Sequence, residues 1–93
     1  MAFTWAGGVL ERLAELGIEP YEVQQVLGYG RRWPRLGHSP AGTVLTIWGR
    51  TATGRALLLV LWPDRGTLNA HITGARELTA DEEQQLQEWE ATR

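Results

Sequence analysis

Three arginines lie near the ends of the expected strands of this chain, and one histidine lies within the last of these strands. The arginines are Arg50, Arg55 and Arg76, and the histidine is His71. The guanidinium group of arginine presents a planar fork of donors that suits a phosphate. Histidine titrates near neutral pH and can give or take a proton. We therefore expect the three arginines to hold one anionic group together, with His71 as the acid or base beside them.

Three successive strands joined by tight turns would position these residues. Residues 55–62, RALLLVLW, carry no polar side chain after the arginine, which is typical of a strand covered on both faces. We predict this segment as the central strand of an antiparallel β-meander of three to four strands. Its neighbours are the strands at residues 43–50 and 67–73, and the second of these alternates between apolar and polar side chains.

The first turn, predicted at residues 51–54, decides how two of the arginines meet. Symmetric pairing about this turn would place Arg50 directly opposite Arg55 on one face of the sheet. Like charges in that position destabilise a hairpin unless an anion or a carboxylate lies between them, or unless the two side chains fan out into water. The second turn is predicted at residues 63–66, where PDRG fits a type I turn.

A second basic cluster precedes the first of these strands. Pro34 and Pro40 exclude a central strand there, so we predict an edge strand at residues 31–36 and a loop at residues 37–42. Arginine and tryptophan together suit single-stranded nucleic acid, whose bases stack on aromatic rings, and they equally suit a protein partner. The candidate RNA-binding residues are Arg31, Arg32, Trp33 and Arg35.

Helices are expected on either side of the strands. Apolar residues recur with helical spacing between residues 8 and 16 and again between residues 20 and 27, and each stripe is followed by glycine. A third helix begins after Thr79, which forms a capping-box spacing with Glu82. Its acidic residues would lie over the basic sheet, while only Leu86 and Trp89 give it an apolar stripe. The fold class predicted is therefore α+β, with two N-terminal helices and one C-terminal helix.

The 93 residues predict one domain, residues 1–93, with an uneven charge distribution. Residues 31–76 hold seven arginines and one acidic residue, whereas residues 77–93 hold one arginine and six acidic residues. Such a division suggests a basic sheet flanked by acidic helices, or simply a solvated basic face that these helices balance.

The composition excludes several classes of site. Cysteine is absent and only two histidines are present, so we expect no metal site. No motif in the sequence indicates an organic cofactor, and we expect none. No apolar run is long enough to span a membrane, and the first residues, MAFTWAGG, lack the features of a signal segment. We expect a cytoplasmic protein that does not associate with membranes.

The sequence resembles the BrnT-type toxins of bacterial toxin–antitoxin pairs. The resemblance is carried by GRTATGR at residues 49–55, the apolar strand after it, HITGAR at residues 71–76, and an acidic C-terminal helix. It extends more loosely to the front half of the chain. It implies a RelE-like fold, a small mixed sheet packed by helices, and a ribonuclease that arrests translation and is neutralised by a tightly bound antitoxin.

The match with that family is uneven at the residues that would do chemistry. Arg50, Arg55 and Arg76 match family arginines, whereas His71 stands where the family has arginine. A lysine and an asparagine of the family's first helix are missing, with Leu13 at the asparagine position, and Leu16 replaces a histidine. These departures keep open whether the site is active.

Two functions from different classes follow. The first is a metal-independent endoribonuclease toxin, in which the arginines hold the scissile phosphate and His71 transfers a proton. Its partners would be RNA and an antitoxin of the ribbon-helix-helix type, with a homodimer or a toxin–antitoxin hetero-oligomer as the assembly. The alternative is a catalytically degenerate protein-binding module of the same fold. A third possibility is a dimer-forming structural domain that uses Trp33 and the thinly covered sheet face.

Overall fold

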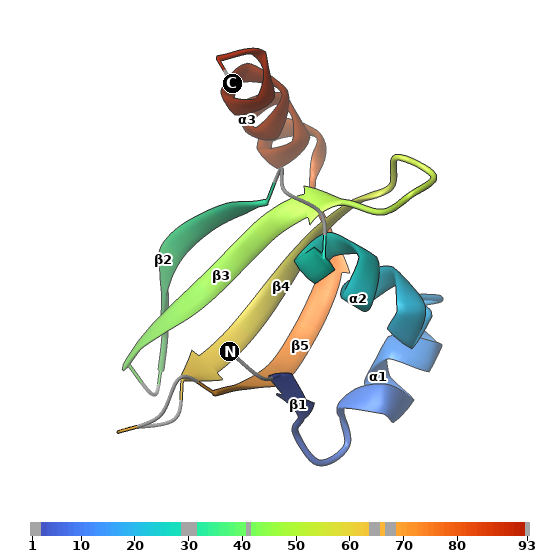
Figure 1. Cartoon of the computed structure of the whole chain (residues 1–93), viewed down its shortest axis with the longest axis vertical. Coiled ribbons are helices and arrows are strands. Elements are labelled where there is room, and N and C mark those ends of the chain that lie inside the picture. Colours follow the sequence, from blue (N-terminus) through green and yellow to red (C-terminus); the bar gives the residue numbers. More distant parts are fainter. Residues whose placement is uncertain (1–2, 29–31, 41, 64–65, 67–68, 93) are drawn as a thin grey trace.

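The computed structural model describes residues 3–28, 32–40, 42–63, 66 and 69–92. In this part of the chain, five strands form one sheet in the order β1-β5-β4-β3-β2, accompanied by three helices (Figure 1). Along the chain the elements are β1 (Phe3–Trp5), α1 (Val9–Glu15), α2 (Pro20–Gly28), β2 (Trp33–Ser39), β3 (Gly42–Arg50), β4 (Ala56–Pro63), β5 (Ala70–Glu77) and α3 (Ala80–Ala91). The α+β class predicted from the sequence is confirmed.

Strand β4 lies in the middle of the sheet, as the apolar run predicts. It pairs antiparallel with β3 on one side and with β5 on the other. Its residues Leu57, Leu59 and Leu61 are fully buried on one face, and Leu58 is buried on the opposite face. A strand that is covered on both sides needs apolar residues at consecutive positions, which explains why β4 does not alternate with polar ones.

The sheet is larger than the predicted meander of three to four strands. Strand β1 pairs in parallel with β5, so the sheet is mixed, as the family resemblance implies. Strand β2 continues to Ser39, so the prediction of a loop at residues 37–42 is wrong over its first part. The physical reason is that Gly37 and its neighbours complete a ladder with β3, and that β2 is an edge strand, where Pro34 is tolerated.

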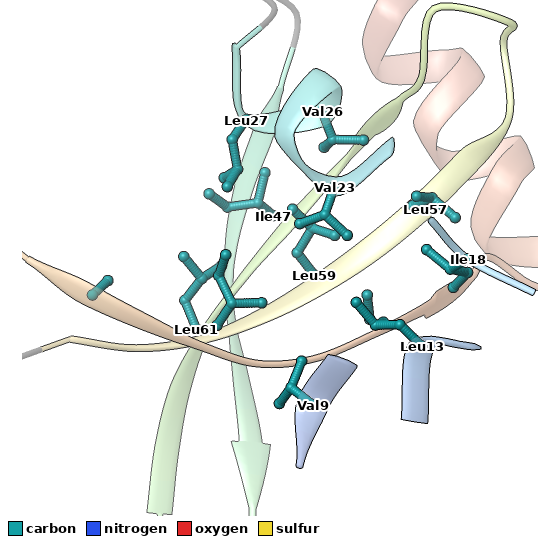
Figure 2. Close-up of a cluster of buried hydrophobic side chains, with 13 residues drawn as sticks. Val9, Leu13, Ile18, Val23, Val26, Leu27, Ile47, Leu57, Leu59 and Leu61 are labelled. Carbon is teal, nitrogen blue, oxygen red and sulfur yellow. The ribbon is translucent and has the colours of Figure 1, made fainter. Parts of the chain in front are cut away.

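Two apolar clusters hold the layers together, one on each face of the sheet. The larger lies between the sheet and helices α1 and α2 (Figure 2) and includes Val9, Leu13, Ile18, Val23, Val26, Ile47 and Leu59. The smaller lies on the α3 side and consists of buried Trp48, Leu58 and Leu86, with Trp33 and Trp89 half-buried around them. The fold therefore rests mainly on the first two helices, and α3 adds a smaller apolar contact.

The helix boundaries follow the predicted signals. Gly17 has a φ of 70° just after α1, a left-handed conformation that glycine adopts without strain. Thr79 and Glu82 form the predicted capping box, in which the Glu82 amide donates to the Thr79 hydroxyl at 3.2 Å and the Thr79 amide donates to the Glu82 carboxylate at 2.8 Å. Residues 64–65 of the predicted turn lie outside the described residues, and Pro63 belongs to β4. The strand predicted at residues 67–73 is displaced along the chain, because β5 begins at Ala70 and pairs with β4 as far as Glu77.

Candidate functional site

The β3–β4 turn places its two flanking arginines on opposite faces of the sheet. Arg50 pairs with Ala56 in the ladder, so the prediction that it lies opposite Arg55 is wrong. Arg55 belongs to the turn, because its amide donates to the Thr51 hydroxyl at 3.1 Å while its carbonyl accepts from the Thr51 amide at 2.9 Å. The closely spaced pair of like charges does not form, and the hairpin needs no anion between them.

Arg50 points toward helix α3 and is held by two of its glutamates. Its Nε donates to the Glu90 carboxylate at 3.0 Å, and a terminal nitrogen donates to Glu83 at 3.2 Å. The same terminal nitrogen also donates to the carbonyl of Gly54 at 3.1 Å. The hydrogen bond with Glu90, followed by that with Glu83, raises the pKa of Arg50. The anion that this arginine was expected to bind is supplied by the chain itself.

Arg76 makes a similar contact with the start of the same helix. Its two terminal nitrogens donate to the two carboxylate oxygens of Glu82 at 2.6 and 2.8 Å, which is a bidentate pair. This contact, together with the bonds from Thr79, lowers the pKa of Glu82 to about 2. Arg76 pairs with Leu58 in the sheet, and Leu58 belongs to the α3 cluster, so Arg50 and Arg76 share one face.

Arg55 lies on the other face and joins three segments. It donates to the Gly17 carbonyl at 2.9 Å, to Glu22 of α2 at 3.0 Å and to Glu77 of β5 at 2.9 Å. The Glu22 side chain is only 12% exposed, so the guanidinium compensates a carboxylate that water barely reaches. The hydrogen bond with Arg55 also lowers the pKa of Glu77. This is a structural clamp between the helical layer and the sheet.

His71 lies at the opposite end of β5 from the arginines. It pairs with Trp62 and with Thr4 of β1, and its Nδ1 is 2.6 Å from the Thr4 hydroxyl. Arg76 follows five residues later, a separation of about 16 Å at the usual rise of a strand. Figure 1 shows α3 at the end of the sheet remote from β1. The expected convergence of His71 with the three arginines is therefore wrong.

The second basic cluster contributes two of its four predicted residues to the α3 side. Trp33 stacks on Trp89 with centroids 5.4 Å apart and planes at 8°, and it meets Trp48 edge-on at 5.5 Å. The Arg35 guanidinium lies 4.6 Å from the ring of Trp33 and 4.7 Å from that of Trp48. Arg32 instead turns back to donate to the Leu27 carbonyl, and Arg31 lies outside the described residues.

One surface thus gathers four of the eight predicted site residues. We call it the α3-facing surface and define it by Trp33, Arg35, Trp48, Arg50 and Arg76. Sequence reasoning missed Trp48, which pairs with Trp33 across β2 and β3. The register between β3 and the proline-containing edge strand β2 could not be predicted from the sequence, so Trp48 was not identified as the neighbour of Trp33. Arg55, His71 and Arg32 lie elsewhere.

A separate apolar pocket opens between β1, β5 and the end of α2. Its volume is about 330 Å³, and its lining combines two aromatic side chains with one amide group. The lining residues are Phe3, Trp5, Gln24, Leu27, Gly28 and Ile72. No residue of the α3-facing surface borders it. Among the described residues, no group of three or more histidine, aspartate or glutamate side chains is placed to hold a metal ion.

Comparison with known proteins leaves the identity of the chain open. Neither protein-family models nor curated protein sequences give a match to this sequence. The resemblance to BrnT-type toxins therefore rests on the residues quoted for it. None of the described helices combines the length and the apolar composition that crossing a membrane requires.

Proposed function

We propose that this chain is an endoribonuclease toxin of a toxin–antitoxin pair, which acts on single-stranded RNA in the cytoplasm. The observation that carries the proposal is the α3-facing surface, where arginines from β3 and β5 lie on the same face as an arginine in contact with two indole rings. The antitoxin would be a ribbon-helix-helix protein bound as a hetero-oligomer, as the family resemblance implies.

The side chains of this surface suit the phosphates and bases of single-stranded RNA. Guanidinium groups such as Arg50 and Arg76 bind phosphates through charge-assisted hydrogen bonds. Indole rings such as Trp33 offer a stacking platform that accepts any base, because every base has a π-face. A surface with both features binds RNA with little sequence preference and with strong dependence on salt.

Cleavage would use the arginines for the electrostatic part of the reaction. RNA cleavage without a metal requires loss of the 2′-hydroxyl proton, stabilisation of the phosphorane and protonation of the leaving oxygen. Arg50 and Arg76 can supply the second of these requirements. His71 is too remote from both to transfer a proton at the same phosphate. RNA binding is supported by the α3-facing surface. RNA cleavage is supported by the family resemblance.

Replacing Arg50 and Arg76 together with alanine is expected to weaken binding of a short single-stranded RNA at least about tenfold, because two phosphate contacts are lost. Any cleavage by the wild-type chain should disappear with them. Fluorescence anisotropy at fixed salt measures the affinity, gel electrophoresis follows cleavage, and circular dichroism verifies folding. Arg12→Ala, on the exposed side of α1, is the control and should change the affinity less than about twofold. Equal losses in the control, or none in the double variant, would contradict the proposal.

A protein-binding module is the second candidate, and a specific observation favours it. Arg50, Arg55 and Arg76 are each engaged by carboxylates of the same chain, so none of these three described arginines forms an open anion site. A module of this kind would bind its partner without cleaving RNA.

Expression in a bacterial host distinguishes the toxin from the protein-binding module. The chain is expressed alone or together with a neighbouring ribbon-helix-helix reading frame. Growth arrest by the chain alone, with loss of cellular RNA and rescue by the neighbour, is expected for the toxin. Normal growth, together with a stable complex between the two products in size-exclusion chromatography, would favour the binding module instead.

A further inference from the structure

Helix α3 covers the α3-facing surface with groups that resemble those of a nucleic-acid strand. Three of its glutamates form ion pairs with two of the three arginines of that surface: Glu82 pairs with Arg76, while Glu83 and Glu90 pair with Arg50. Within the described residues, its two other acidic side chains, Asp81 and Glu88, take part in no ion pair. The carboxylates are therefore divided between those over the arginines and those facing solvent.

The aromatic contact between α3 and the sheet has the geometry of base stacking. The indole of Trp89 lies nearly parallel to that of Trp33, with planes at 8° and centroids 5.4 Å apart. A base bound to a stacking platform adopts a similar parallel arrangement. Arg35 adds a contact to the same helix, because it donates to the Gln85 side chain at 3.1 Å.

The apolar attachment of α3 is small compared with that of the other helices. Leu86 is its one buried residue within the described part of the chain, and Trp89 is half-buried. The main cluster between α1, α2 and the sheet contains no residue of α3. Displacement of α3 would thus expose the smaller cluster and leave the principal core in place.

We infer that α3 is an intramolecular competitor for the RNA site, with its glutamates in the place of phosphates and Trp89 in the place of a base. RNA then binds only as α3 leaves the sheet, and any partner that displaces or retains α3 regulates the activity. This inference rests on the proposed function, since it concerns the occupancy of the same surface.

The Glu83→Gln/Glu90→Gln variant tests the competition directly, because it frees Arg50 and keeps the capping box of α3. A short fluorescein-labelled single-stranded RNA is expected to bind this variant about threefold to tenfold more tightly than it binds the wild-type chain. This range corresponds to the loss of two partly exposed ion pairs. The matched control is Asp81→Asn/Glu88→Gln, which removes the same number of charges from the solvent side of the same helix. It should tighten binding by less than about twofold.

Hydrogen exchange of the wild-type chain gives a second, structural measurement. Saturation with the same RNA should accelerate amide exchange in residues 80–91, whereas α1 and α2 should stay protected. Unchanged or stronger protection of residues 80–91 in the bound state would overturn the inference, as would equal tightening by the variant and its control. In that case, weaker binding by Arg50→Ala/Arg76→Ala would still support the proposed function. Absence of RNA binding by the wild-type chain and by both glutamine variants would contradict both.

Discussion

Replacing Arg55 with alanine is expected to lower the free energy of unfolding by about 2 kcal/mol, an effect on stability and not on RNA binding. The substitution removes bonds to Gly17, Glu22 and Glu77 at once. Breaking a buried ion pair typically costs about 3–5 kcal/mol and breaking an exposed one at most about 1 kcal/mol. The half-buried position of Arg55, whose side chain is 23% exposed, places it between these limits. Urea unfolding followed by circular dichroism measures the loss.

A second substitution shows how much of the lost stability comes from the contact between Arg55 and Glu22. Much of the cost should come from the Glu22 carboxylate, which loses its counter-ion and keeps only the hydrogen bond that the Glu19 amide donates to it at 3.0 Å. Glu22→Gln in the Arg55→Ala background should therefore recover about 1 kcal/mol. Arg12→Ala, at an exposed site, should stay within about 0.5 kcal/mol of wild type. Normal stability of Arg55→Ala combined with loss of RNA binding would instead restore Arg55 to the candidate site.

Acidification is expected to remove about 2 kcal/mol of stability through Glu82 alone. Its pKa is lowered to about 2 in the folded chain, from 4.5 for an ordinary glutamate, first by Arg76 and also by the Thr79 backbone. Because the unfolded chain binds this proton more readily, the contribution is complete above about pH 4.5 and disappears as the pH falls toward 2. The full shift would correspond to roughly 3 kcal/mol, which partial exposure of the pair reduces.

The comparison with Glu82→Gln isolates this contribution. Glutamine keeps the capping box but carries no charge to titrate. At neutral pH the variant should be less stable than wild type by about 2 kcal/mol, and the two curves should converge near pH 2. Thermal unfolding at a series of pH values provides the measurement. At neutral pH Glu88→Gln, at an exposed site of the same helix, should stay within about 0.5 kcal/mol of wild type. A constant difference between wild type and Glu82→Gln across the pH series would show that the Arg76 contact does not perturb the carboxyl.

The sequence predicts the architecture well because the signals for it are local. The apolar run of β4 identifies the central strand, and Thr79 with Glu82 marks the start of α3. The edge position of β2 follows from its proline, although its length does not, since pairing with β3 extends it to Ser39. The acidic nature of α3 also correctly indicates that this helix lies over basic strands.

The site was harder to predict because it depends on register and on contacts between distant segments. Periodicity alone could not show that Arg55 belongs to the turn and points to α2. The convergence of His71 with Arg76 was predicted from their closeness in the sequence, but β5 continues to Glu77 and places the two residues about 16 Å apart along one extended strand. Trp48 was missed because its partner Trp33 lies on the neighbouring edge strand, whose register with β3 could not be inferred from the sequence.

The β3–β4 turn has a consequence for how short arginine motifs are interpreted. Arg55 follows Arg50 by five positions, and hydrogen bonds through Thr51 hold the turn so that the Arg50 guanidinium contacts α3 and the Arg55 guanidinium contacts α2. The spacing of the two arginines in this motif therefore determines which face of the sheet each side chain lies on. Wherever the same hairpin forms, one arginine should contact the helices on one face and the other arginine the helix on the opposite face. A single-residue insertion or deletion there would uncouple one layer from the sheet, so this loop should tolerate sequence change far better than it tolerates length change.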